Sequence, residues 1–450
     1  MHDLDSTLVV VGTPPGRGGI GCLRLSGAEA ETIGRKLFRP ASLRSKTVGN
    51  GLAFGRLLDR MGRPIDHGFL VVFHPIRSYT GEPSVELWSH GSPAVLAELL
   101  DSAVSLGARP AGPGEFTYRA LRNGRLDLSQ AEAIADLIDA RTAYQARIAF
   151  SQAEGAVSRR LAPLRAVLED CVARCEAAVE FVDEADTHLQ QGAVAQALER
   201  GRCECRELLS AFEAGRDVRS GAIVAITGRP NVGKSSIFNR LLGRDRSIVT
   251  EIPGTTRDTV EEDIDLAGIP ARLVDTAGLR EAEDPVETEG VRRAEVARRE
   301  ADVVVLVLDG SRPIEEAEGH AIEDAGAPES RTILVRNKTD LPQHEWSGCQ
   351  VDVSARTGEG LAALREAIAR QLRGSGPLED PILTNARQAQ ALREADQALA
   401  RASHGARNGL PDDLVLEDMK LALRHLQEIT GEFTTEDLLD RIFSTFCIGK

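Results

Sequence analysis

The sequence predicts a multidomain α/β protein: an N-terminal α+β domain, a discontinuous all-α helical domain, and a domain with a mostly parallel sheet inserted between the two helical parts. Three observations predict this fold class. Short apolar runs alternate with Gly and Pro turns up to about Arg119, helical periodicity begins near Ser129, and a strand, a glycine-rich loop and a helix follow one another from Ala222. A chain of 450 residues is also long enough for two or three domains, each with its own core.

Residues 1–120 are expected to form the N-terminal α+β domain. Its strands are predicted from the runs TLVVVGT, GCLRLSG, GFLVVFH and SVELWSHG. The segment Gly16–Gly21 matches the dinucleotide-binding pattern G-x-G-x-x-G, but that fingerprint requires a helix directly after it, and CLRLSG predicts a strand. We therefore interpret these glycines as a turn between two strands.

Two helical parts, residues 121–218 and 376–450, are expected to form one domain. The first set of long helices is predicted to run to about Ala214. An interruption is expected near Pro163, because proline lacks the backbone N–H that a helix interior requires. The segment GSGP, residues 374–377, has the composition of a linker.

Capping signals mark the expected helix ends. Ser129 with Glu132 and Thr434 with Asp437 fit the capping-box pattern, in which two side chains satisfy backbone N–H groups at the start of a helix. Gly431 is predicted to end the helix before the second box.

Residues 219–375 are expected to form the inserted domain. Its strands are predicted from AIVAITG, ARLVDTAG, DVVVLVLDG and TILVRNKTD, and a helix from SSIFNRLLG. Because apolar strands alternate with helices, the sheet is predicted to be mostly parallel.

Charge and cysteine content limit the partners and the location. The net charge of -15 argues against a general electrostatic attraction to nucleic acid, since such binding is built from Lys and Arg side chains that neutralise phosphates. An RNA partner would need a local basic patch or a helper protein. The seven cysteines, an odd number, indicate reduced thiols in the cytoplasm.

No segment predicts export, a membrane anchor or a metal cluster. The start MHDLDSTLVVVG lacks the features of a signal peptide, and no apolar run is long enough to span a bilayer. Cys171, Cys175, Cys203 and Cys205 could be imagined as a zinc site, but they lie in helical patterns without C-x-x-C spacing. A zinc ion is therefore the less favoured interpretation.

The segment Gly228–Ser235, GRPNVGKS, fits the phosphate-binding pattern G-x-x-x-x-G-K-S between a predicted strand and a predicted helix. Backbone N–H groups of such a loop bind phosphates, Lys234 would contact the β- and γ-phosphate oxygens, and Ser235 would bind Mg2+. The pattern predicts a nucleotide site in the inserted domain.

Two further motifs identify the nucleotide as GTP. DTAG, Asp275–Gly278, ends a predicted strand, where a carboxylate can hold the magnesium shell and a glycine can follow the γ-phosphate. NKTD, Asn337–Asp340, ends a later strand, and Asp340 can accept from the two N–H groups on the edge of guanine, whereas adenine would leave the carboxylate unpaired. Ser354–Arg356 would complete the base pocket with backbone N–H groups. The sequence therefore predicts a Ras-like P-loop GTPase domain.

The catalytic machinery departs from the Ras pattern. Ras-like enzymes place a Gln after the DTAG-type loop to orient water, and here that region holds Leu279, which cannot do so. An arginine finger raises such rates by about 10^3- to 10^5-fold, on the order of 4 to 7 kcal/mol, so a substitute is expected. Asn231 and the segment Val249–Asp258 offer neutral oxygens suited to a monovalent cation beside the β/γ bridge.

Six motifs closely resemble one family along essentially the whole chain, the tRNA-modification GTPases called MnmE or TrmE. They are GRPNVGKS, GTTRD, DTAGLRE, the terminal CIGK, TPPGRGGIG and RPAGPGEFTYRAL. The resemblance implies a potassium site, a magnesium site and a residue that orients the hydrolytic water. By the resemblance, the potassium site consists of Asn231, Thr250, Ile252 and Thr255, and the magnesium site of Ser235 and Thr256. The residue that orients the water is Glu287. The resemblance also implies that GTPase domains dimerise across their nucleotide faces.

The complete nucleotide site, with its ions, combines the motifs and the resemblance. Lys234 and Glu287 are its candidate catalytic residues. The residues expected to line it are Asn231, Val232, Gly233, Lys234, Ser235, Ser236, Thr250, Glu251, Ile252, Pro253, Gly254, Thr255, Thr256, Asp275, Thr276, Ala277, Gly278, Asn337, Lys338, Asp340, Ser354, Ala355 and Arg356.

The resemblance makes residues 1–120 a tetrahydrofolate-binding and dimerisation domain, similar to folate-dependent one-carbon enzymes. The positions carried over are Arg24, Glu86, Arg125 and Lys450. A carboxylate such as Glu86 can accept from the amidine-like edge of a pterin, and cations can pair with a glutamate tail. Arg125 replaces a lysine found in some members, which keeps the charge but not the geometry.

The chain ends in TFCIGK, residues 445–450, and Cys447 is a further catalytic candidate. Gly449 and Lys450 do not fit a C-a-a-X lipidation box. If Lys450 lies near the folate, the final helix brings Cys447 to the same place, within one chain or across a dimer interface. A nucleophilic thiol and an inert buried cysteine both stay open, because activation of a thiol depends on its neighbours.

The resemblance implies a cytoplasmic, potassium-activated GTPase that works as a homodimer with an FAD-containing partner of the MnmG or GidA family, in a heterotetramer. Together they would form 5-carboxymethylaminomethyl or aminomethyl uridine at the wobble position, U34, of certain tRNAs. The one-carbon donor would be 5-formyl- or methylene-tetrahydrofolate. Two alternatives are a ribosome-assembly GTPase switch and a scaffold whose nucleotide serves only dimerisation.

Overall fold

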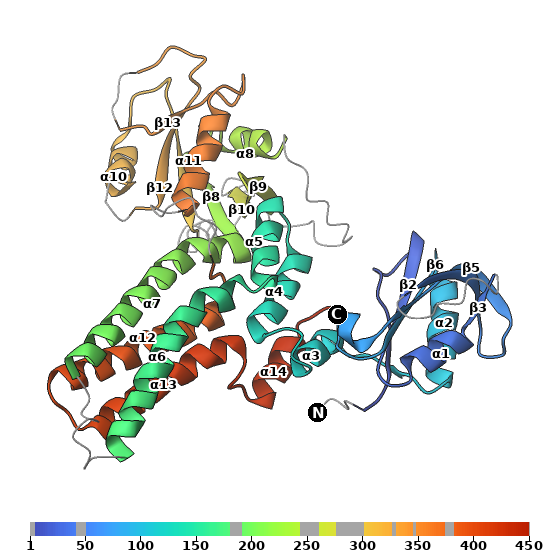
Figure 1. Ribbon diagram of the computed structural model, residues 1–450. Coiled ribbons are helices and arrows are strands. Elements are labelled where there is room, and N and C mark those ends of the chain that lie inside the picture. Colours follow the sequence, from blue (N-terminus) through green and yellow to red (C-terminus); the bar gives the residue numbers. More distant parts are fainter. Residues whose placement is uncertain are drawn as a thin grey trace, which may run out of the picture. The chain divides into compact units, whose positions relative to one another are not determined.

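The computed structural model (Figure 1) divides into two compact units, each with its own sheet. The first unit comprises Met1–Ala135, Ala153–Gly155 and Gln427–Lys450, and the second comprises Asp136–Gln152 and Ala156–Leu426. None of the helices placed in the structure is long and apolar enough to cross a membrane. The described residues are 5–41, 51–180, 191–243, 261–275, 301–325, 330–344, 348–373 and 382–449.

The first unit contains a seven-stranded sheet in the order β3-β4-β5-β6-β2-β1-β7. Paired strands are antiparallel except β1 and β7, which are parallel. The four runs predicted as strands are confirmed, and a strand follows Gly16, as predicted. The predicted turn is too long, because β2 begins at Gly18 and only the first of the four glycines lies between the strands. The elements are β1 (Leu8–Val11), β2 (Gly18–Ser26), α1 (Ala30–Lys36), β3 (Phe38–Pro40), β4 (Leu52–Leu58), β5 (Pro64–Phe73), η2 (Pro75–Arg77), β6 (Ser84–Gly91), α2 (Pro93–Ser105) and β7 (Arg109–Pro110).

Helices α1 and α2 cover one face of this sheet (Figure 1). Gly34 of α1 packs so closely on Val85 that an added Cβ would lie 2.6 Å from it, and Leu96 of α2 lies over Gly21 in the same way. Since side chains alternate along a strand, the other face of β2 carries Arg24. The larger apolar core therefore lies on the helical face, while the opposite face carries Arg24 together with a smaller apolar cluster of Leu8, Val10 and Phe116.

The C-terminal segment packs on the N-terminal part of the chain inside the first unit. The rings of Tyr118 and Phe443 meet edge to face at 5.4 Å, and the Tyr118 hydroxyl donates to Glu436 at 3.0 Å. Ile448 forms an isolated β-bridge with Pro113. The helices involved are α3 (Glu115–Arg122), α4 (Leu128–Asp139) and α14 (Glu436–Phe443).

The predicted capping box of Ser129 and Glu132 is wrong by two residues. Helix α4 begins at Leu128, and the reciprocal pair is Asp127 with Gln130. The Asp127 carboxylate accepts from the Gln130 backbone N–H at 2.9 Å, and the Gln130 side chain accepts from the Asp127 N–H at 3.0 Å. A carboxylate two residues earlier accepts from the free N–H group of Gln130, and the Ser129 hydroxyl donates to it instead.

The predicted box of Thr434 and Asp437 is also displaced, by one residue. Thr435 is the N-cap of α14, and its side chain accepts from the Leu438 N–H at 3.3 Å. Adjacent threonines offer the same hydroxyl, so the sequence does not fix which one caps the helix. The predicted stop at Gly431 is confirmed, since the preceding helix ends one residue earlier and Gly431 has a φ of +88°.

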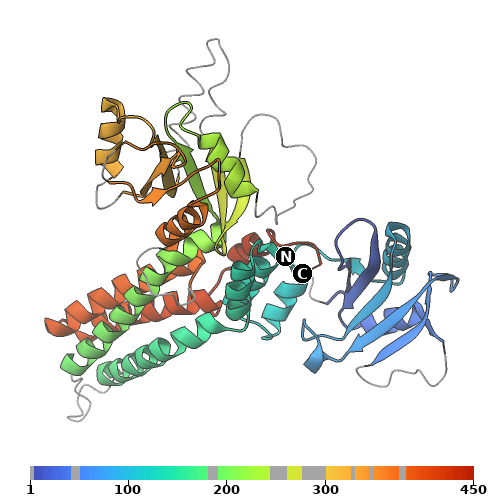
Figure 2. The same ribbon diagram turned by 90° about the horizontal axis from the view of Figure 1, so that it is seen from above.

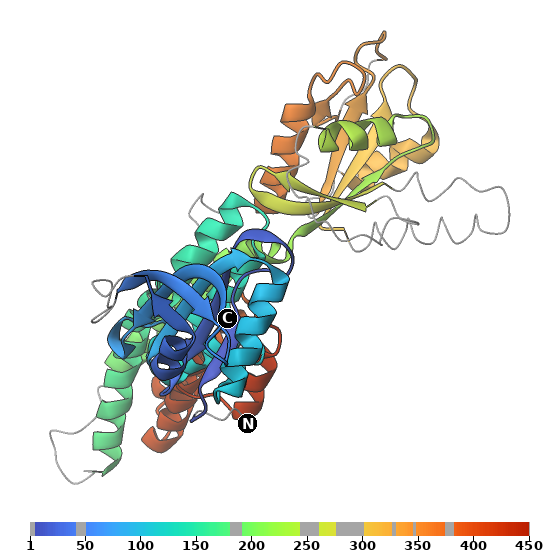
Figure 3. The same ribbon diagram turned by 90° about the vertical axis from the view of Figure 1, so that its right-hand side faces the viewer.

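The second unit contains a six-stranded sheet in the order β13-β12-β11-β8-β10-β9. Its pairs are parallel except β9 with β10, which confirms the mostly parallel sheet. Helices α8 and α11 lie beside each other and share the buried core with the strands (Figure 3). The elements are β8 (Ala222–Thr227), α8 (Lys234–Leu242), β9 (Glu261–Leu266), β10 (Ile269–Asp275), β11 (Val303–Asp309), α10 (Glu316–Ala325), β12 (Thr332–Asn337), β13 (Val351–Asp352) and α11 (Leu361–Arg373).

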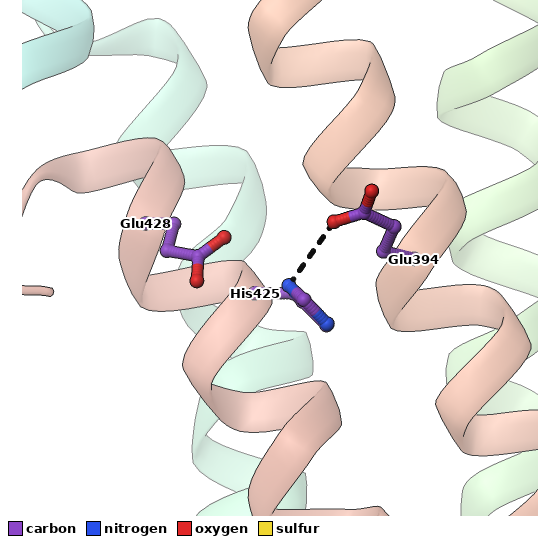
Figure 4. A group of neighbouring side chains, drawn as sticks. All are labelled: Glu394, His425 and Glu428. Atoms are coloured by element: carbon purple, nitrogen blue, oxygen red, sulfur yellow. Dashed lines mark ion pairs between the residues drawn. The ribbon is translucent and has the colours of Figure 1, made fainter. Parts of the chain in front are cut away.

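Helices that precede this sheet in the sequence pack against helices that follow it. Helices α7 and α12 run side by side (Figure 2), with Arg202 and Asp396 paired at 3.3 Å. Between α12 and α13, Glu394 pairs with His425 at 3.4 Å, and Glu428 follows His425 by one turn of the same helix (Figure 4). The helices are α5 (Ala143–Ala153), α6 (Ala156–Glu180), α7 (Gln191–Ser220), α12 (Ala386–Arg407) and α13 (Asp412–Thr430).

Two expectations for the long helices are wrong. Helix α6 continues through Pro163, and α7 runs to Ser220, beyond the expected end near Ala214. A proline inside a helix costs roughly 3 kcal/mol, mainly through one lost hydrogen bond and a steric clash. Leu161 and Leu164 are buried beside it, so apolar packing offsets that cost.

Candidate nucleotide-binding site

The phosphate-loop motif connects β8 with α8, as predicted. Gly228 and Gly233 have φ values of +140° and +99°, a region that residues with a Cβ rarely adopt. A Cβ at Gly233 would also collide with the side-chain amide of Asn337. Only glycine therefore permits this close approach, and the free N–H groups at the start of α8 can bind phosphate.

Lys234 begins α8 and is 6% exposed. Its Nζ donates to the Arg229 carbonyl oxygen at 2.8 Å across the loop. This contact holds the ammonium group against the loop that is expected to bind phosphate.

Asn337 ties the base-recognition motifs to the phosphate loop. Its side chain, 1% exposed as a residue, donates from Nδ2 to the Val232 carbonyl at 2.7 Å and accepts at Oδ1 from the Ala355 N–H at 3.0 Å. Asp340 accepts from the Ser354 hydroxyl at 2.7 Å. Three motifs far apart in the sequence thus meet at one edge of the sheet.

Two residues expected near Mg2+ lie at the ends of elements beside the phosphate loop. Ser235 lies in the first turn of α8, and Asp275 is the last residue of β10, 3% exposed. Because β10 and β8 are parallel, with Asp275 in register with Ile226, the carboxylate lies beside the start of the phosphate loop. A hydroxyl and a carboxylate are the oxygen donors that Mg2+ prefers.

Asn231 is the described member of the potassium set. It is exposed in the phosphate loop, has a φ of +65° and lines a cavity beside the loop. Neutral oxygens such as its amide oxygen fit an alkali cation. The other predicted site residues outside the described stretches are Thr250, Glu251, Ile252, Pro253, Gly254, Thr255, Thr256, Thr276, Ala277, Gly278, Glu287 and Lys450.

The motifs did not identify Asp309, which lies at the end of β11. Its carboxylate accepts from Lys338 Nζ at 2.6 Å and from the Ser311 N–H and hydroxyl. Burial opposes ionisation, but the bonds from Lys338 and Ser311 outweigh it and hold the pKa of the Asp309 carboxyl below its usual value. The signal in the sequence is an aspartate that ends a buried strand, in VVVLVLDG, directly beside the strand that ends in NKTD.

A cavity of about 250 Å³ lies next to the phosphate loop. Residues 229–232 of the loop line one side, and residues 308–318 line the other, including Asp309. An ion pair between Arg229 and Glu315 joins the two sides. The segment after β11 is therefore part of the surroundings of the nucleotide site.

The polar face of the N-terminal sheet carries two of the predicted folate residues together. The register of β2 and β6 places Arg24 opposite Glu86, and their side chains pair at 3.0 Å. Trp88 donates to the same carboxylate at 3.1 Å. A carboxylate flanked by a guanidinium and an indole fits the donor-rich edge of a pterin.

The end of the chain reaches this face within the same unit. Arg24 donates to the Gly449 carbonyl at 3.4 Å, and the Gly114 N–H donates to the Cys447 carbonyl at 3.4 Å. Cys447 is exposed. Arg125 lies instead beside Gly81, where an added Cβ would be 3.2 Å from its stem.

Cys22 is a second cysteine near this face. Cys22, on β2 two residues before Arg24, is buried, and burial with the nearby Glu86 charge raises the pKa of its thiol to about 12. At neutral pH this thiol is protonated and unreactive.

Helix α5 is clamped onto the β9–β10 hairpin, which ends at Asp275. The Thr142 hydroxyl donates to the Gly268 carbonyl in the hairpin turn at 2.6 Å, and Arg141 pairs with Asp263 at 2.6 Å. Ile148 is buried in the same core cluster as the six-stranded sheet. The helices before the nucleotide-binding sheet thus share its core.

Comparison with known proteins gives consistent results. One family model, described as the MnmE helical domain, matches residues 128–447, and another, described as the GTP-binding protein TrmE N-terminus, matches residues 7–125. Proteins named tRNA modification GTPase MnmE are similar over nearly full length: that of Koribacter versatilis is 44% identical over 100% of both chains, and that of Syntrophotalea carbinolica is 41% identical over 99% of both. The solved G domain of the T. maritima FeoB iron transporter is 29% identical over 33% of this chain and 98% of its own, with a TM-score of 0.25.

Proposed function

Since the chain belongs to the MnmE family of tRNA modification GTPases and is a GTP hydrolase, we propose that potassium activates it and that it modifies the wobble uridine of certain tRNAs. It works in the cytoplasm as a homodimer with an FAD-containing partner of the MnmG or GidA family. The product is 5-carboxymethylaminomethyl or aminomethyl uridine at U34, and a tetrahydrofolate derivative donates one carbon.

The proposed domains follow the sequence boundaries. They are a folate-binding and dimerisation domain at 1–120, a helical domain from 121–218 and 376–450, and a GTPase domain at 219–375. The compact units differ from these boundaries, because α3, the start of α4 and the C-terminal segment pack with one another and belong to the first unit.

One observation carries the GTPase site: Asn337 bonds both Val232 of the phosphate loop and Ala355 of the base pocket. A nucleotide bound there meets N–H groups at its phosphates and the Asp340 carboxylate at guanine. In the proposed reaction Lys234 binds the β- and γ-phosphate oxygens and Glu287 orients the hydrolytic water.

The cations complete this site. Ser235 and Thr256 would hold Mg2+, and Asn231, Thr250, Ile252 and Thr255 would hold K+. When bound, K+ supplies positive charge near the β/γ bridge, in the role that an arginine finger has elsewhere. The exposed position of Asn231 in the phosphate loop supports this assignment.

The N-terminal face supports the folate proposal through its chemistry. Arg24 and Glu86 form a partly exposed charged pair with side-chain exposures of 21% and 18%. Such a pair can exchange its mutual contact for a ligand with complementary donors and acceptors. The net charge of -15 also favours a helper protein for tRNA, which agrees with an FAD-containing partner.

We propose further that hydrolysis moves the long helices through the clamp of α5 on the β9–β10 hairpin. The hairpin follows the segment Val249–Asp258, which carries proposed cation ligands, and ends at Asp275, where the DTAG motif begins; Thr142 and Arg141 bind it from the helical side. A rigid contact of this kind transmits a shift of the hairpin to α5.

The test of the tRNA function is the modification itself. Cells from which the gene is deleted are expected to lose the modified U34, and the full chain restores it while Lys234→Ala does not. Nucleoside mass spectrometry of total tRNA measures this. An unchanged modification in the deletion strain refutes the proposal.

A further inference from the structure

Asp309 lies at the end of β11, between the phosphate-binding part and the base-binding part of the nucleotide site. Strands β11 and β12 are parallel neighbours, and their last residues, Asp309 and Asn337, are in register. The Gly310 N–H donates to the Asn337 carbonyl at 3.0 Å, which joins the loops that follow the two strands. Asp309 also lines the cavity beside the phosphate loop. Its carboxylate therefore lies between the phosphate loop and the NKTD motif.

The Asp309 carboxylate is fixed by its own turn and in turn fixes Lys338. Its side chain is 7% exposed, and Oδ1 accepts from the Ser311 N–H at 3.0 Å and from the Ser311 hydroxyl at 2.6 Å. Oδ2 accepts from Lys338 Nζ at 2.6 Å. Because the bonds from Ser311 fix Oδ1, Oδ2 has a defined position for the ion pair with Lys338.

Apart from this ion pair, Lys338 has a long, flexible side chain whose ordering costs conformational entropy. It has a left-handed φ of +65° and a side chain that is 28% exposed. Ordering a lysine side chain costs up to about 2 kcal/mol of conformational entropy. Its neighbours Asn337 and Asp340 are already held by bonds to Val232, Ala355 and Ser354. The ion pair with Asp309 orders the one long side chain of the motif before the nucleotide arrives.

We propose that Asp309 is a positioning residue for guanine-nucleotide binding, which acts by holding Lys338 in its nucleotide-binding orientation. The inference rests on the proposed function, in which Lys338 lines the nucleotide site as part of the NKTD motif expected at the guanosine. Without Asp309, the nucleotide must order Lys338 on binding, so affinity falls. GTP and GDP share the guanosine, and both lose affinity by the same factor.

The test is the dissociation constant of each nucleotide for the full chain with Asp309→Asn. We expect Kd to rise roughly three- to tenfold for both GTP and GDP, because restraining one flexible side chain is worth about that factor. The turnover rate at saturating GTP changes by less than about twofold, so the effect appears in KM. A merely structural role would lower the maximal rate and the melting temperature as well.

A double-mutant cycle with Lys338→Met shows whether the effect goes through the lysine. If it does, D309N/K338M binds no more weakly than K338M alone. Asp352→Asn is the matched control, because Asp352 pairs with Arg336 at 2.5 Å on the neighbouring strands of the same sheet. Its nucleotide affinities are expected to equal those of the wild type.

Three results would overturn the proposal. They are unchanged affinities in D309N, losses of affinity that add in the double mutant, or a gain in GTP affinity without an equal gain in GDP affinity. The last would show that Asp309 acts as a negative charge that repels phosphate. If D309N does not fold, Asp309→Glu shifts the carboxylate by one methylene, and its affinity loss is expected to vanish in the K338M background. A wild-type chain that binds no GTP would count against the proposed function instead.

Discussion

The nucleotide site and the polar face of the N-terminal sheet are assembled in different ways. In the nucleotide site, Gly228 and Gly233 shape a loop of eight residues, and Asn337 reaches it from a neighbouring strand end. On the N-terminal face, Arg24 meets Glu86 through strand register and meets Gly449 from 425 positions away in the sequence. Backbone shape defines the first site, whereas long-range side-chain contacts define the second. The two should therefore respond independently to substitution.

The largest expected effect comes from Lys234→Ala. Loss of the ammonium group at the phosphate oxygens should lower GTP turnover by at least about 100-fold, since one preorganised donor is worth about that factor. Binding of 5-formyl-tetrahydrofolate should not change. Turnover assays and folate titrations of the full chain measure both. Lys420→Ala, which removes a surface pair with Glu176, is the control and should change neither. Coupled losses would show that the two sites are not separate.

The reverse experiment is Glu86→Gln. A hydrogen bond to a charged group is worth about 1.5 to 3 kcal/mol, so folate affinity should fall by roughly tenfold or more. GTP turnover should stay at the wild-type value. Glu98→Gln, on the exposed side of α2, is the matched control. Folate binding that survives in Glu86→Gln would remove this carboxylate from the folate site.

A smaller effect is expected at the clamp between α5 and the hairpin. Thr142→Val keeps the shape but removes the bond to the Gly268 carbonyl and the bond from the Gln145 N–H at 3.1 Å, each worth about 1 kcal/mol of unfolding free energy. We expect U34 modification to fall several-fold while GTP turnover falls by less than twofold. Ser210→Ala, whose hydroxyl bonds only within α7 in the described contacts, should change neither. Equal losses of turnover and modification would argue against coupling through α5.

The last prediction, with the smallest expected effect, concerns the rates at which the cysteines are chemically labelled. Burial raises the pKa values of the Cys22, Cys175 and Cys205 thiols to about 12, so their reactive thiolate forms are scarce at pH 8. Iodoacetamide should label exposed Cys203 and Cys447 first. Labelling of the buried three should rise only toward pH 12 or on unfolding. Peptide mass spectrometry measures the rates, and a Cys205 rate equal to that of Cys203 at pH 8 would contradict this burial.

The sequence predicts most of the nucleotide site because its physics is local. A glycine pair, a lysine and a helix start occur within eight residues, and the strands that carry DTAG and NKTD are strongly apolar. Asp309 could not be found this way. An aspartate after a strand is common, and its meaning depends on the register that places it beside Lys338.

Local rules also failed where several residues offer the same chemistry. Asp127 competes with Ser129 for the start of α4, and Thr435 competes with Thr434 at α14. Pro163 shows the opposite case, in which tertiary packing overrides a strong local preference. The N-terminal pair of Arg24 and Glu86 was inferred from resemblance, because nothing local predicts that β2 pairs with β6.

The most direct test of the account is GTP turnover by the full chain in KCl and in NaCl, with Asn231→Ala and Asn231→Gly beside the wild type. Gly suits the φ of +65° at this position and so separates loss of the amide from backbone strain. The account predicts a wild-type rate at least about tenfold higher in KCl, and a ratio near one in both variants. Equal wild-type rates in the two salts, or a potassium preference that persists in both variants, would contradict it.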